Sequence, residues 1–473
     1  MKTIVIIGGG WSGTLTAIQL LENSKNISVK IVNSGQPFGL GIAFSTTDSE
    51  HLLNVPAGRM SAFPNKQNHF VDWLIANNYS DNNLQDQFVP RIIYGKYILE
   101  LFNYYKSNPQ LKLIDAKATN IEKNGINYTI SLSNSSKLIA DKIVLALGNF
   151  IPSSPKSNTP EFFESPYYFQ NPWNEDYLKN IPLNQNILLI GTGLTMVDSV
   201  LSIKKTVFTG KIFVVSPKGY TPAPHGKSDN YPDFYSEIKD RSMLEIFSTV
   251  RKHFKIAESK NISWRAVVDS LRPHVQKIWV ELSDKGKQQF ISHIRHVWGV
   301  ARHRLPVVTH QEIFNLKESG QLEIIGGRLL DMQVINESTI VSVRLRKSSE
   351  IRKLTVGRVI NCTGPQTNYI ELKDELVVNL LIGKIIFASD LKMGIQTTLT
   401  GRVLQEGSKP SNDIFAIGSL LRGVLWETTA VPEIRIQAES IAKQIIDSIK
   451  SVSYTHLRAH ETKANLVCRL LLE

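Results

Sequence analysis

Cysteine is almost absent from this sequence of 473 residues, which contains only Cys362 and Cys468. Two cysteines so far apart in sequence form neither a disulfide framework nor the C-x-x-C pair of a dithiol redox centre. The sequence therefore excludes a disulfide-stabilised secreted domain, and it predicts a protein of the reducing cytoplasm.

Long hydrophobic runs are also missing. No window approaches the roughly 18 uncharged apolar residues that a membrane helix needs. The nearest candidate, residues 376–388, is short and contains Lys384. The apolar N-terminus is interpreted as a strand and not as a signal peptide. We therefore expect no membrane segment.

The chain has no acidic excess, since its formal net charge is +12. Its basic residues are dispersed, with no run beyond Lys204-Lys205 before a cluster near residue 300. A nucleic-acid-binding domain concentrates such residues on one face or along one helix. We expect no nucleic-acid partner, and anionic cofactors explain the charge.

The first thirteen residues join a buried strand, residues 3–7, to the pattern Gly8-Gly-Gly-Trp-Ser-Gly13. In G-x-G-x-x-G the first glycine allows a tight turn, the second admits a pyrophosphate, and the third lets the helix pack on the strand. The N-terminus of the following helix adds free N–H groups and a positive dipole. A glycine-rich turn without a ligand is the alternative. We predict that a dinucleotide binds at Gly8, Gly10, Trp11, Ser12 and Gly13.

The second strand, residues 27–32, ends at Asn33, where dinucleotide-binding folds usually place an acidic residue against the adenosine ribose. Asn33 can still donate a hydrogen bond to a ribose.

The segment 39–64 has neither helical nor strand periodicity, and a loop this long is usually functional or disordered. Its apolar content favours a functional loop, so we expect Asn54, Pro56 and Met60 to form a wall beside the cofactor ring. Core packing is the alternative for Pro56 and Met60.

Beyond this loop, His69–Ala76 and residues 94–105 are predicted helices. Residues 126–132 and 137–147 are predicted to form a hairpin, which returns the chain to the first sheet at Gly148.

A second unit begins with a buried strand, residues 186–190, followed by Gly191-Thr-Gly193-Leu-Thr-Met196. Met196 replaces the third glycine, and we expect it to separate helix and strand slightly without closing the phosphate site. After the strand at 211–215, Ser216 and Lys218 stand where a hydroxyl and a cation would meet a ribose 2′-phosphate. This favours NADPH over NADH, and a solvated loop lysine is the competing interpretation.

Residues 231–305 are predicted to form a helical insertion. Its end places Arg295, Arg302 and Arg304 close together in sequence with no acidic residue nearby. Such a cluster suggests an anion site for a substrate carboxylate or a cofactor phosphate, and pairing with distant acids is an equal alternative. His293, His296 and His303 lack accompanying Cys, Asp or Glu residues, so we expect no metal site.

The chain is predicted to re-enter the first domain at 358–362, with Gly364 after that strand and Gly418 after the strand at 413–417. A final helix is expected at 433–449.

Residues 452–473 resemble the translation of a sequencing-library adaptor, and we interpret them as read-through beyond a truncated gene end. The predicted fold is α/β, with two Rossmann-like dinucleotide-binding domains and a helical insertion. The expected domains are an FAD-binding domain at 1–155 and 356–450 and an NAD(P)-binding domain at 156–355.

The chain resembles the FAD/NAD(P)-binding protein family that includes flavin-dependent aspartate N-hydroxylases and urate-hydroxylase-like proteins. The similarity runs from residue 4 to about residue 438. The segments that carry it are His51-Leu-Leu-Asn-Val-Pro-Ala-Gly-Arg-Met-Ser61, Pro90-Arg-Ile-Ile-Tyr-Gly95, Gly191-Thr-Gly-Leu-Thr-Met-Val-Asp198, 298–304 and 426–433. Gly299 and Ala301 stand where family members tend to have Asp and His, which leaves the substrate open.

The resemblance implies FAD on the first domain, NAD(P)H on the second, and monooxygenation as the activity. Two nucleotide sites without a dithiol exclude the disulfide reductases. We expect hydroxylation of a small, anionic, nitrogen-containing substrate by molecular oxygen through a flavin peroxide. The alternatives are a flavin reductase or oxidase without oxygen transfer, and a non-catalytic dinucleotide sensor.

Overall fold

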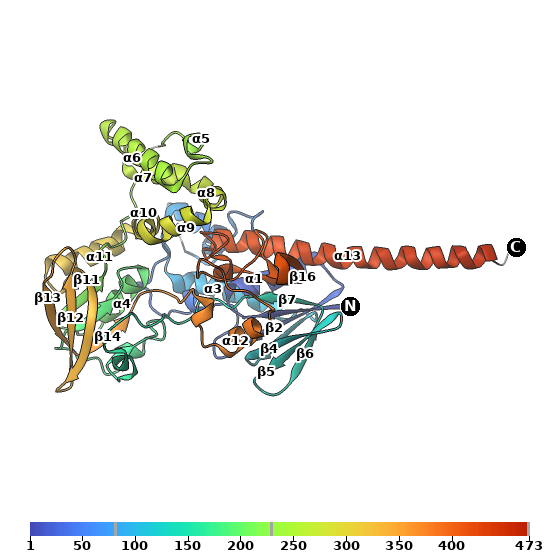
Figure 1. Cartoon of the computed structure of the whole chain (residues 1–473), viewed down its shortest axis with the longest axis horizontal. Coiled ribbons are helices and arrows are strands. Elements are labelled where there is room, and N and C mark those ends of the chain that lie inside the picture. The colour runs from blue at the N-terminus through green and yellow to red at the C-terminus, as the bar shows by residue number, and fades with distance from the viewer. Residues whose placement is uncertain (80–82, 228–229, 471–473) are drawn as a thin grey trace.

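The computed structural model describes residues 1–79, 83–227 and 230–470, with side chains up to residue 450. Two sheets with parallel strands at their centres form two α/β domains, and a helical lobe projects from the body (Figure 1). The predicted architecture of two dinucleotide-binding domains with a helical insertion is confirmed. Within the described ranges, no helix is both long enough and apolar enough to span a bilayer.

The first domain is built on a six-stranded sheet with the order β15-β16-β7-β1-β2-β3. Strand β1 pairs in parallel with both β2 and β7, so the first glycine loop leaves the centre of the sheet. The strands are β1 (Lys2–Ile7), β2 (Ile27–Asn33), β3 (Leu111–Asp115), β7 (Lys142–Leu145), β15 (Arg402–Gln405) and β16 (Lys409–Ala416).

Helices cover one face of this sheet, and a small sheet with one helix covers the other. On the first face, α1 (Trp11–Asn23) packs against α13 (Val431–Leu470), beside α2 (His69–Ala76) and α3 (Arg91–Lys106). The other face carries β4 (Ala118–Asn124), β5 (Asn127–Leu132), β6 (Lys137–Ala140) and α12 (Glu375–Ile382).

The predicted hairpin is only partly correct. Strands β5 and β6 do pair in antiparallel fashion, but β7 is a separate strand that runs parallel to β1 in the main sheet. The chain changes sheets at Asp141, whose carboxylate accepts hydrogen bonds from Lys2 Nζ at 2.7 Å and from the Thr3 backbone N–H at 2.8 Å. A continuous apolar run cannot reveal such a change of partner, because periodicity does not report which sheet a strand joins.

The second domain is built on a seven-stranded sheet with the order β13-β12-β11-β10-β9-β14-β8. The strands are β8 (Tyr168–Phe169), β9 (Ile187–Ile190), β10 (Ile212–Ser216), β11 (Leu322–Ile335), β12 (Ser338–Leu345), β13 (Ile351–Val356) and β14 (Arg358–Asn361). Helices α4 (Leu194–Lys204) and α11 (Val307–Glu318) pack against it.

Strand β14 corrects the expected return to the first domain. It pairs in parallel with β9 and β8, so the chain leaves the second sheet after Asn361 and not before Arg358. Strand β11 is one long strand, with an irregularity in its pairing with β12 between Leu329 and Asp331.

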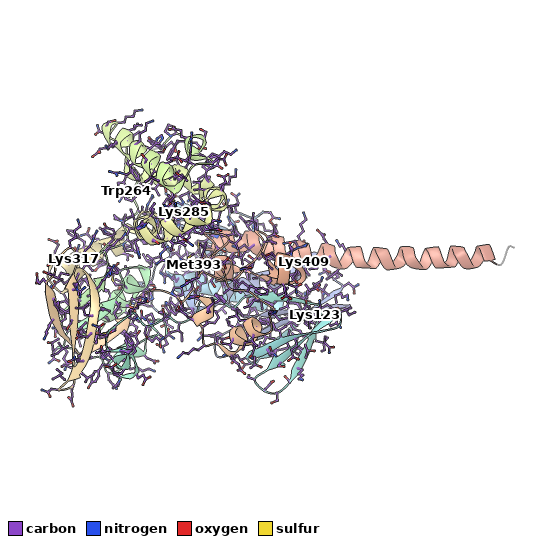
Figure 2. All side chains as sticks on the ribbon, viewed as in Figure 1. Lys123, Trp264, Lys285, Lys317, Met393 and Lys409 are labelled. Carbon is purple, nitrogen blue, oxygen red and sulfur yellow. The ribbon has the colours of Figure 1, made fainter. Side chains whose placement is uncertain are left out.

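The helical lobe contains α5 (Tyr235–Ile238), α6 (Met243–Ser259), α7 (Trp264–Leu271), α8 (Val275–Glu281), α9 (Asp284–Gln289), a π-helical turn (Phe290–Ile294) and α10 (Arg295–Arg302). Its core includes Met393 and Trp426 from the first domain, which attach the lobe to the body. In Figure 2, Trp264 and Lys285 lie in the projecting lobe, and Met393 lies near the centre of the molecule.

Helix α13 continues to Leu470, and Figure 1 shows it extending far from the body. The prediction that this helix ends at Ile449 is wrong for the backbone, because residues 450–470 contain no Gly or Pro to stop it. The interpretation of residues 452–473 as adaptor read-through remains a prediction. The structure describes no side chains beyond residue 450.

Glu323 on β11 provides a pH test of the second sheet. Its carboxylate binds both guanidinium nitrogens of Arg352, one of them at 3.1 Å, and Lys211 Nζ at 2.8 Å. The hydrogen bonds from Arg352 lower the pKa of Glu323 to about 2.

We expect Glu323→Gln to reduce the free energy of unfolding by about 1 kcal/mol near neutral pH, a value that allows for solvent screening of a partly exposed pair. Because the folded pKa is lower than the unfolded value of about 4.3, the stabilisation is complete above that pH and disappears as the pH falls toward 2. Urea unfolding of both proteins across this range measures it. A difference that stays constant down to the lowest pH would contradict the assignment.

Candidate functional site

The first glycine loop has the geometry of a dinucleotide-binding turn. Gly8 has φ +110°, and a Cβ there would lie 2.1 Å from the Ala146 carbonyl oxygen. A Cβ on Gly13 would lie 2.0 Å from the Gly8 carbonyl oxygen, so helix and strand touch at that point. Gly10 precedes α1 and supplies no side-chain cap to its first N–H groups. Gly8 and Gly13 therefore require glycine for the two steric reasons that the motif predicts, and the role of Gly10 in admitting a pyrophosphate stays a prediction.

A pocket of about 580 Å³ opens from this loop. Of the predicted cofactor residues, it is lined by Gly8, Gly10, Trp11, Ser12, Asn33, Asn54, Met60, Gly148 and Gly418. Trp11 also has a buried indole N–H with no hydrogen-bond partner among the described residues, an orphan donor that suits a bound acceptor. Pro56 lies at the start of a short turn, Ala57–Arg59, and does not contribute to the described lining. Met60 both lines the pocket and packs in the core.

Asn33 holds the loop itself. Its side-chain oxygen accepts a hydrogen bond from the Gly9 backbone N–H at 3.0 Å, and its amide donates to the Gln36 carbonyl at 2.7 Å. Each group retains one further hydrogen-bonding position. A ribose contact by Asn33 therefore remains a prediction, and its observed role is to fix the turn.

The second loop repeats this geometry. Gly191 has φ +105°, and a Cβ there would lie 2.5 Å from the Cys362 carbonyl oxygen. Gly193 precedes α4, and a Cβ there would meet nothing within 4 Å. Met196 is completely buried in the core beneath the helix and leaves the loop open. The second loop therefore has a turn and a free helix N-terminus of the kind that receives phosphate.

A cleft of about 660 Å³ lies along this loop and includes Gly191, Gly193, Ser216, Lys218 and Gly364 in its lining. The Ser216 hydroxyl accepts hydrogen bonds from Thr192 Oγ1 at 3.1 Å and from the Gly219 N–H at 3.0 Å. Lys218 Nζ donates to the His293 carbonyl of the helical lobe at 3.1 Å. Both predicted residues thus lie in the cleft, and both already have protein partners.

The pocket of the first loop and the cleft of the second loop adjoin. Leu194, Thr195 and Pro365 line both of them. Ligands in the two spaces would therefore meet at the start of α4. This arrangement can bring two redox-active rings together without a protein redox group between them.

Cys362 is buried beneath the second loop, 3.5 Å from Ser199 Oγ. Burial raises the pKa of its thiol to about 12. The thiolate is the reactive form, so this cysteine is unsuited to redox exchange.

We expect Cys362 to resist a thiol reagent such as Ellman's reagent in the folded Cys468→Ser variant, and to react fully after denaturation. Reaction in the native state at the rate of a free thiol would contradict the buried position.

The arginine cluster divides into two groups. Arg302 makes a two-pronged ion pair with Glu427 at 2.9 and 2.7 Å, and Arg304 pairs with Asp269 at 2.9 Å. Only Arg295 of the three lines the cleft. For Arg302 and Arg304 the structure shows the second of the two alternatives, pairing with acids that are distant in sequence, and the anion site stays a prediction for Arg295.

The histidines of this segment do not assemble with other ligands. Within the described ranges, no three His, Cys, Asp or Glu side chains are grouped so that they could hold a metal ion. His296 and His303 line the cleft beside the arginines.

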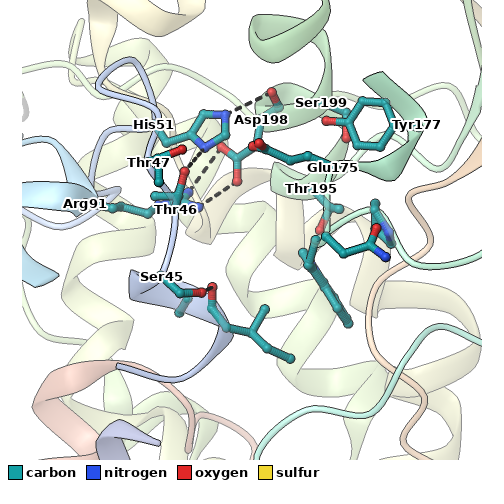
Figure 3. A pocket seen from close by; sticks show the side chains of 15 residues that line it. Ser45, Thr46, Thr47, His51, Arg91, Glu175, Tyr177, Thr195, Asp198 and Ser199 are labelled. Atoms are coloured by element: carbon teal, nitrogen blue, oxygen red, sulfur yellow. Dashed lines mark hydrogen bonds and ion pairs between the residues drawn. The ribbon is translucent and has the colours of Figure 1, made fainter. Parts of the chain in front are cut away.

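A smaller pocket lies where the two domains meet (Figure 3). Arg91 of α3 makes a two-pronged ion pair with Asp198 of α4 at 2.6 and 3.2 Å. His51 Nε2 lies 3.1 Å from both the Asp198 carbonyl and Ser202 Oγ, and its Nδ1 lies 2.8 Å from Thr46 Oγ1. His51, Arg91 and Asp198 come from three different segments that carry the family resemblance, and their contacts join the two domains. The sequence gives no sign that these segments contact one another.

We expect Asp198→Asn to slow flavin reduction by NADPH about 10-fold while the FAD content stays unchanged, because a small misplacement of the two domains disturbs the approach of the rings. Asp176→Asn, which removes an exposed pair with Lys179 in the same domain, is the matched control. Stopped-flow absorbance measures both variants. Equal rates of flavin reduction in the two variants would show that the ion pair of Arg91 with Asp198 does not position the two domains.

Comparison with known proteins agrees with this geometry. Residues 5–150 match a family model described as FAD-NAD(P)-binding. An uncharacterised protein of Escherichia coli K12, YdhS, is 21% identical over 229 residues, which cover 43% of this chain and 39% of that relative. The chain thus spans well under two thirds of the length of that relative.

Solved structures match over nearly the whole chain. L-lysine 6-monooxygenase from Pseudomonas syringae has a TM-score of 0.66 at 14% identity, over 95% of this chain and 100% of the other. Ornithine hydroxylase PvdA from Pseudomonas aeruginosa has a TM-score of 0.63 at 12% identity, over 95% and 99%. Thioredoxin reductase from T. acidophilum has a TM-score of 0.52 at 11% identity, over 95% and 100%.

The chain therefore has the two-dinucleotide-binding flavoprotein fold. Residues 5–150 are similar to the FAD-NAD(P)-binding family model, and the predicted similarity to N-hydroxylases is confirmed at the level of the fold.

Proposed function

We propose that this chain is an FAD-dependent NAD(P)H oxidoreductase, a monooxygenase that hydroxylates a small, anionic, nitrogen-containing substrate with molecular oxygen. The observation that carries the proposal is the junction of the two spaces at Leu194, Thr195 and Pro365, one space at each glycine loop. Cys362, the only cysteine whose side chain the structure describes, is buried and alone, so a dithiol acceptor is not part of the chemistry.

FAD fits the first pocket because hydrogen-bond donors line it and because its volume of about 580 Å³ leaves space for the ring. Gly8, Gly10 and the N-terminus of α1 would hold its pyrophosphate, the orphan indole N–H of Trp11 would find an acceptor, and Asn54 and Met60 would lie beside the ring. When bound, FAD supplies hydride acceptance and the activation of oxygen.

NADPH fits the cleft at the second loop for similar reasons. The N-terminus of α4 after Gly193 would face the pyrophosphate, and Ser216 and Lys218 lie where a 2′-phosphate would be bound. NADH remains the alternative coenzyme. In this scheme the protein binds and orients, and it needs neither a nucleophilic triad nor a metal.

The helical lobe would exclude water from the reacting centre. Trp298 of the lobe, together with Trp426 and Met393 of the first domain, lines the cleft at the second loop. Indole and thioether surfaces at this position would shield the junction from solvent, which a monooxygenase needs more than an enzyme that simply passes electrons to a soluble acceptor.

The test is to mix the FAD-loaded protein with NADPH and a panel of amine-containing carboxylic acids while oxygen uptake is recorded. The proposal predicts NADPH oxidation stimulated by one substrate class and a hydroxylamine product in the mass spectrum. Stoichiometric hydrogen peroxide without product would favour an oxidase or reductase. Tight cofactor binding with no turnover under any condition would favour a sensor.

A further inference from the structure

Two arginines, one from the helical lobe and one from the first domain, line the cleft. Arg295 is the first residue of α10 in the helical lobe, and Arg422 follows a short turn, Gly418–Leu421, in the first domain. Both belong to the lining of the cleft at the second loop, together with Trp426. The sequence pattern predicts an anion site at Arg295 but not at Arg422, because no cluster of basic residues surrounds Arg422.

Neither guanidinium has an acidic partner in the described part of the chain. This separates them from Arg302 and Arg304, which make ion pairs with Glu427 and Asp269 in the same region. The guanidinium carbon of Arg422 lies 5.8 Å from the centroid of the Trp426 ring, so an aromatic face provides its nearest described stabilising contact.

The two cations also affect each other. Burial lowers the pKa of Arg295. The pKa of Arg422 is lowered first by burial and then by the positive charge of Arg295. Two like charges held close together in a partly dry cleft destabilise the empty site, and an anion between them would remove that cost.

We infer that Arg295 and Arg422 together bind one oxyanion in the cleft. The planar fork of each guanidinium suits the two oxygens of a carboxylate or of a phosphate. The oxyanion has two sources with this chemistry, the carboxylate of the small substrate and a phosphate of the nicotinamide dinucleotide.

The position of Arg422 favours the carboxylate. The dinucleotide phosphates would have the α4 N-terminus, Ser216 and Lys218 on the second domain as partners, whereas Arg422 belongs to the first domain. Gly418, four residues earlier, lines the pocket of the first loop. An anion held by Arg422 is thus on the side where oxygen chemistry would take place. The assignment to substrate rests on the proposed function, but the binding of an oxyanion does not.

The experiment is calorimetric titration of the oxidised, FAD-loaded full chain, without turnover. The probes are malonate, inorganic phosphate and NADP⁺. The variants are Arg295→Gln and Arg422→Gln, with Arg422→Lys as a variant that keeps the charge. The matched control is Arg251→Gln, since Arg251 is an exposed arginine over an aromatic ring, Phe247, outside the cleft.

We expect malonate binding to weaken about 10-fold or more in both glutamine variants, to weaken less in Arg422→Lys, and to stay unchanged in the control. Malonate binding that persists in protein saturated with NADP⁺ identifies the substrate carboxylate as the source. If NADP⁺ and malonate compete for binding, and the same variants weaken the binding of NADP⁺, then the oxyanion is a phosphate of the dinucleotide.

Wild-type affinity for malonate, phosphate and NADP⁺ in folded Arg295→Gln and Arg422→Gln proteins would overturn the inference. A chain that binds malonate through these arginines and yet never oxidises NADPH would refute the proposed function alone. Thermal unfolding of every variant separates loss of the site from loss of the fold.

Discussion

Replacing Gly193 with valine is expected to leave the protein folded and loaded with FAD, and to slow flavin reduction by NADPH about 100-fold. That factor corresponds to about 2.7 kcal/mol. A Cβ at this position would meet no protein atom within 4 Å, and the backbone at φ −83° accepts valine, so we expect the fold to tolerate the change. The added methyl groups project into the space where a pyrophosphate would approach the α4 N-terminus.

The first glycine loop supplies the comparison for this prediction. Gly10→Val would obstruct the FAD pocket and yield colourless protein, whereas Gly13→Ala would destabilise the fold because its Cβ collides with the Gly8 carbonyl oxygen. FAD content, thermal unfolding and anaerobic reduction rates distinguish the three variants. If NADPH reduces the Gly193→Val variant at the normal rate, the coenzyme does not bind at the second loop.

The second large effect concerns Arg302. We expect Arg302→Met to lower the free energy of unfolding by about 3 kcal/mol, because it leaves the Glu427 carboxylate without its two-pronged partner in a site where both side chains are less than 15% exposed. The double variant Arg302→Met/Glu427→Met should recover much of the loss, since the uncompensated charge is then absent.

Denaturant unfolding measures both proteins. The control is Arg241→Met, which removes an exposed pair with Glu245 and should cost no more than about 0.5 kcal/mol. Unchanged stability of Arg302→Met together with a raised KM for substrate would show that Arg302 binds an anion after all, and would restore the interpretation of the cluster as one site.

The parts of the site that could be predicted from sequence depend on neighbours in the chain. A strand, a tight turn and a helix N-terminus are encoded within about fifteen residues, so the positive φ of Gly8 and Gly191 and the contact of Gly13 with Gly8 follow from local geometry. Helices of the lobe such as Trp264–Leu271 were predicted for the same reason, because an amphipathic period is a local property.

The parts that could not be predicted depend on residues far apart in sequence. The ion pairs of Arg302 with Glu427 and of Arg91 with Asp198 join segments more than a hundred residues apart, and nothing in either segment names its partner. The sheet to which β14 belongs is likewise decided by β9, about 170 residues earlier. Arg422 was missed because its importance comes from the absence of an acid near it in space.

Electron exchange between two dinucleotides bound at the two adjoining sites has a direct optical test. The measurement is the visible absorbance spectrum of the FAD-loaded protein, recorded without oxygen before and after NADPH. We expect one bound FAD per chain, bleaching of the flavin absorbance on addition of NADPH, and its return when oxygen is admitted. A protein that binds no FAD, or a bound flavin whose spectrum neither NADPH nor NADH changes, would contradict it.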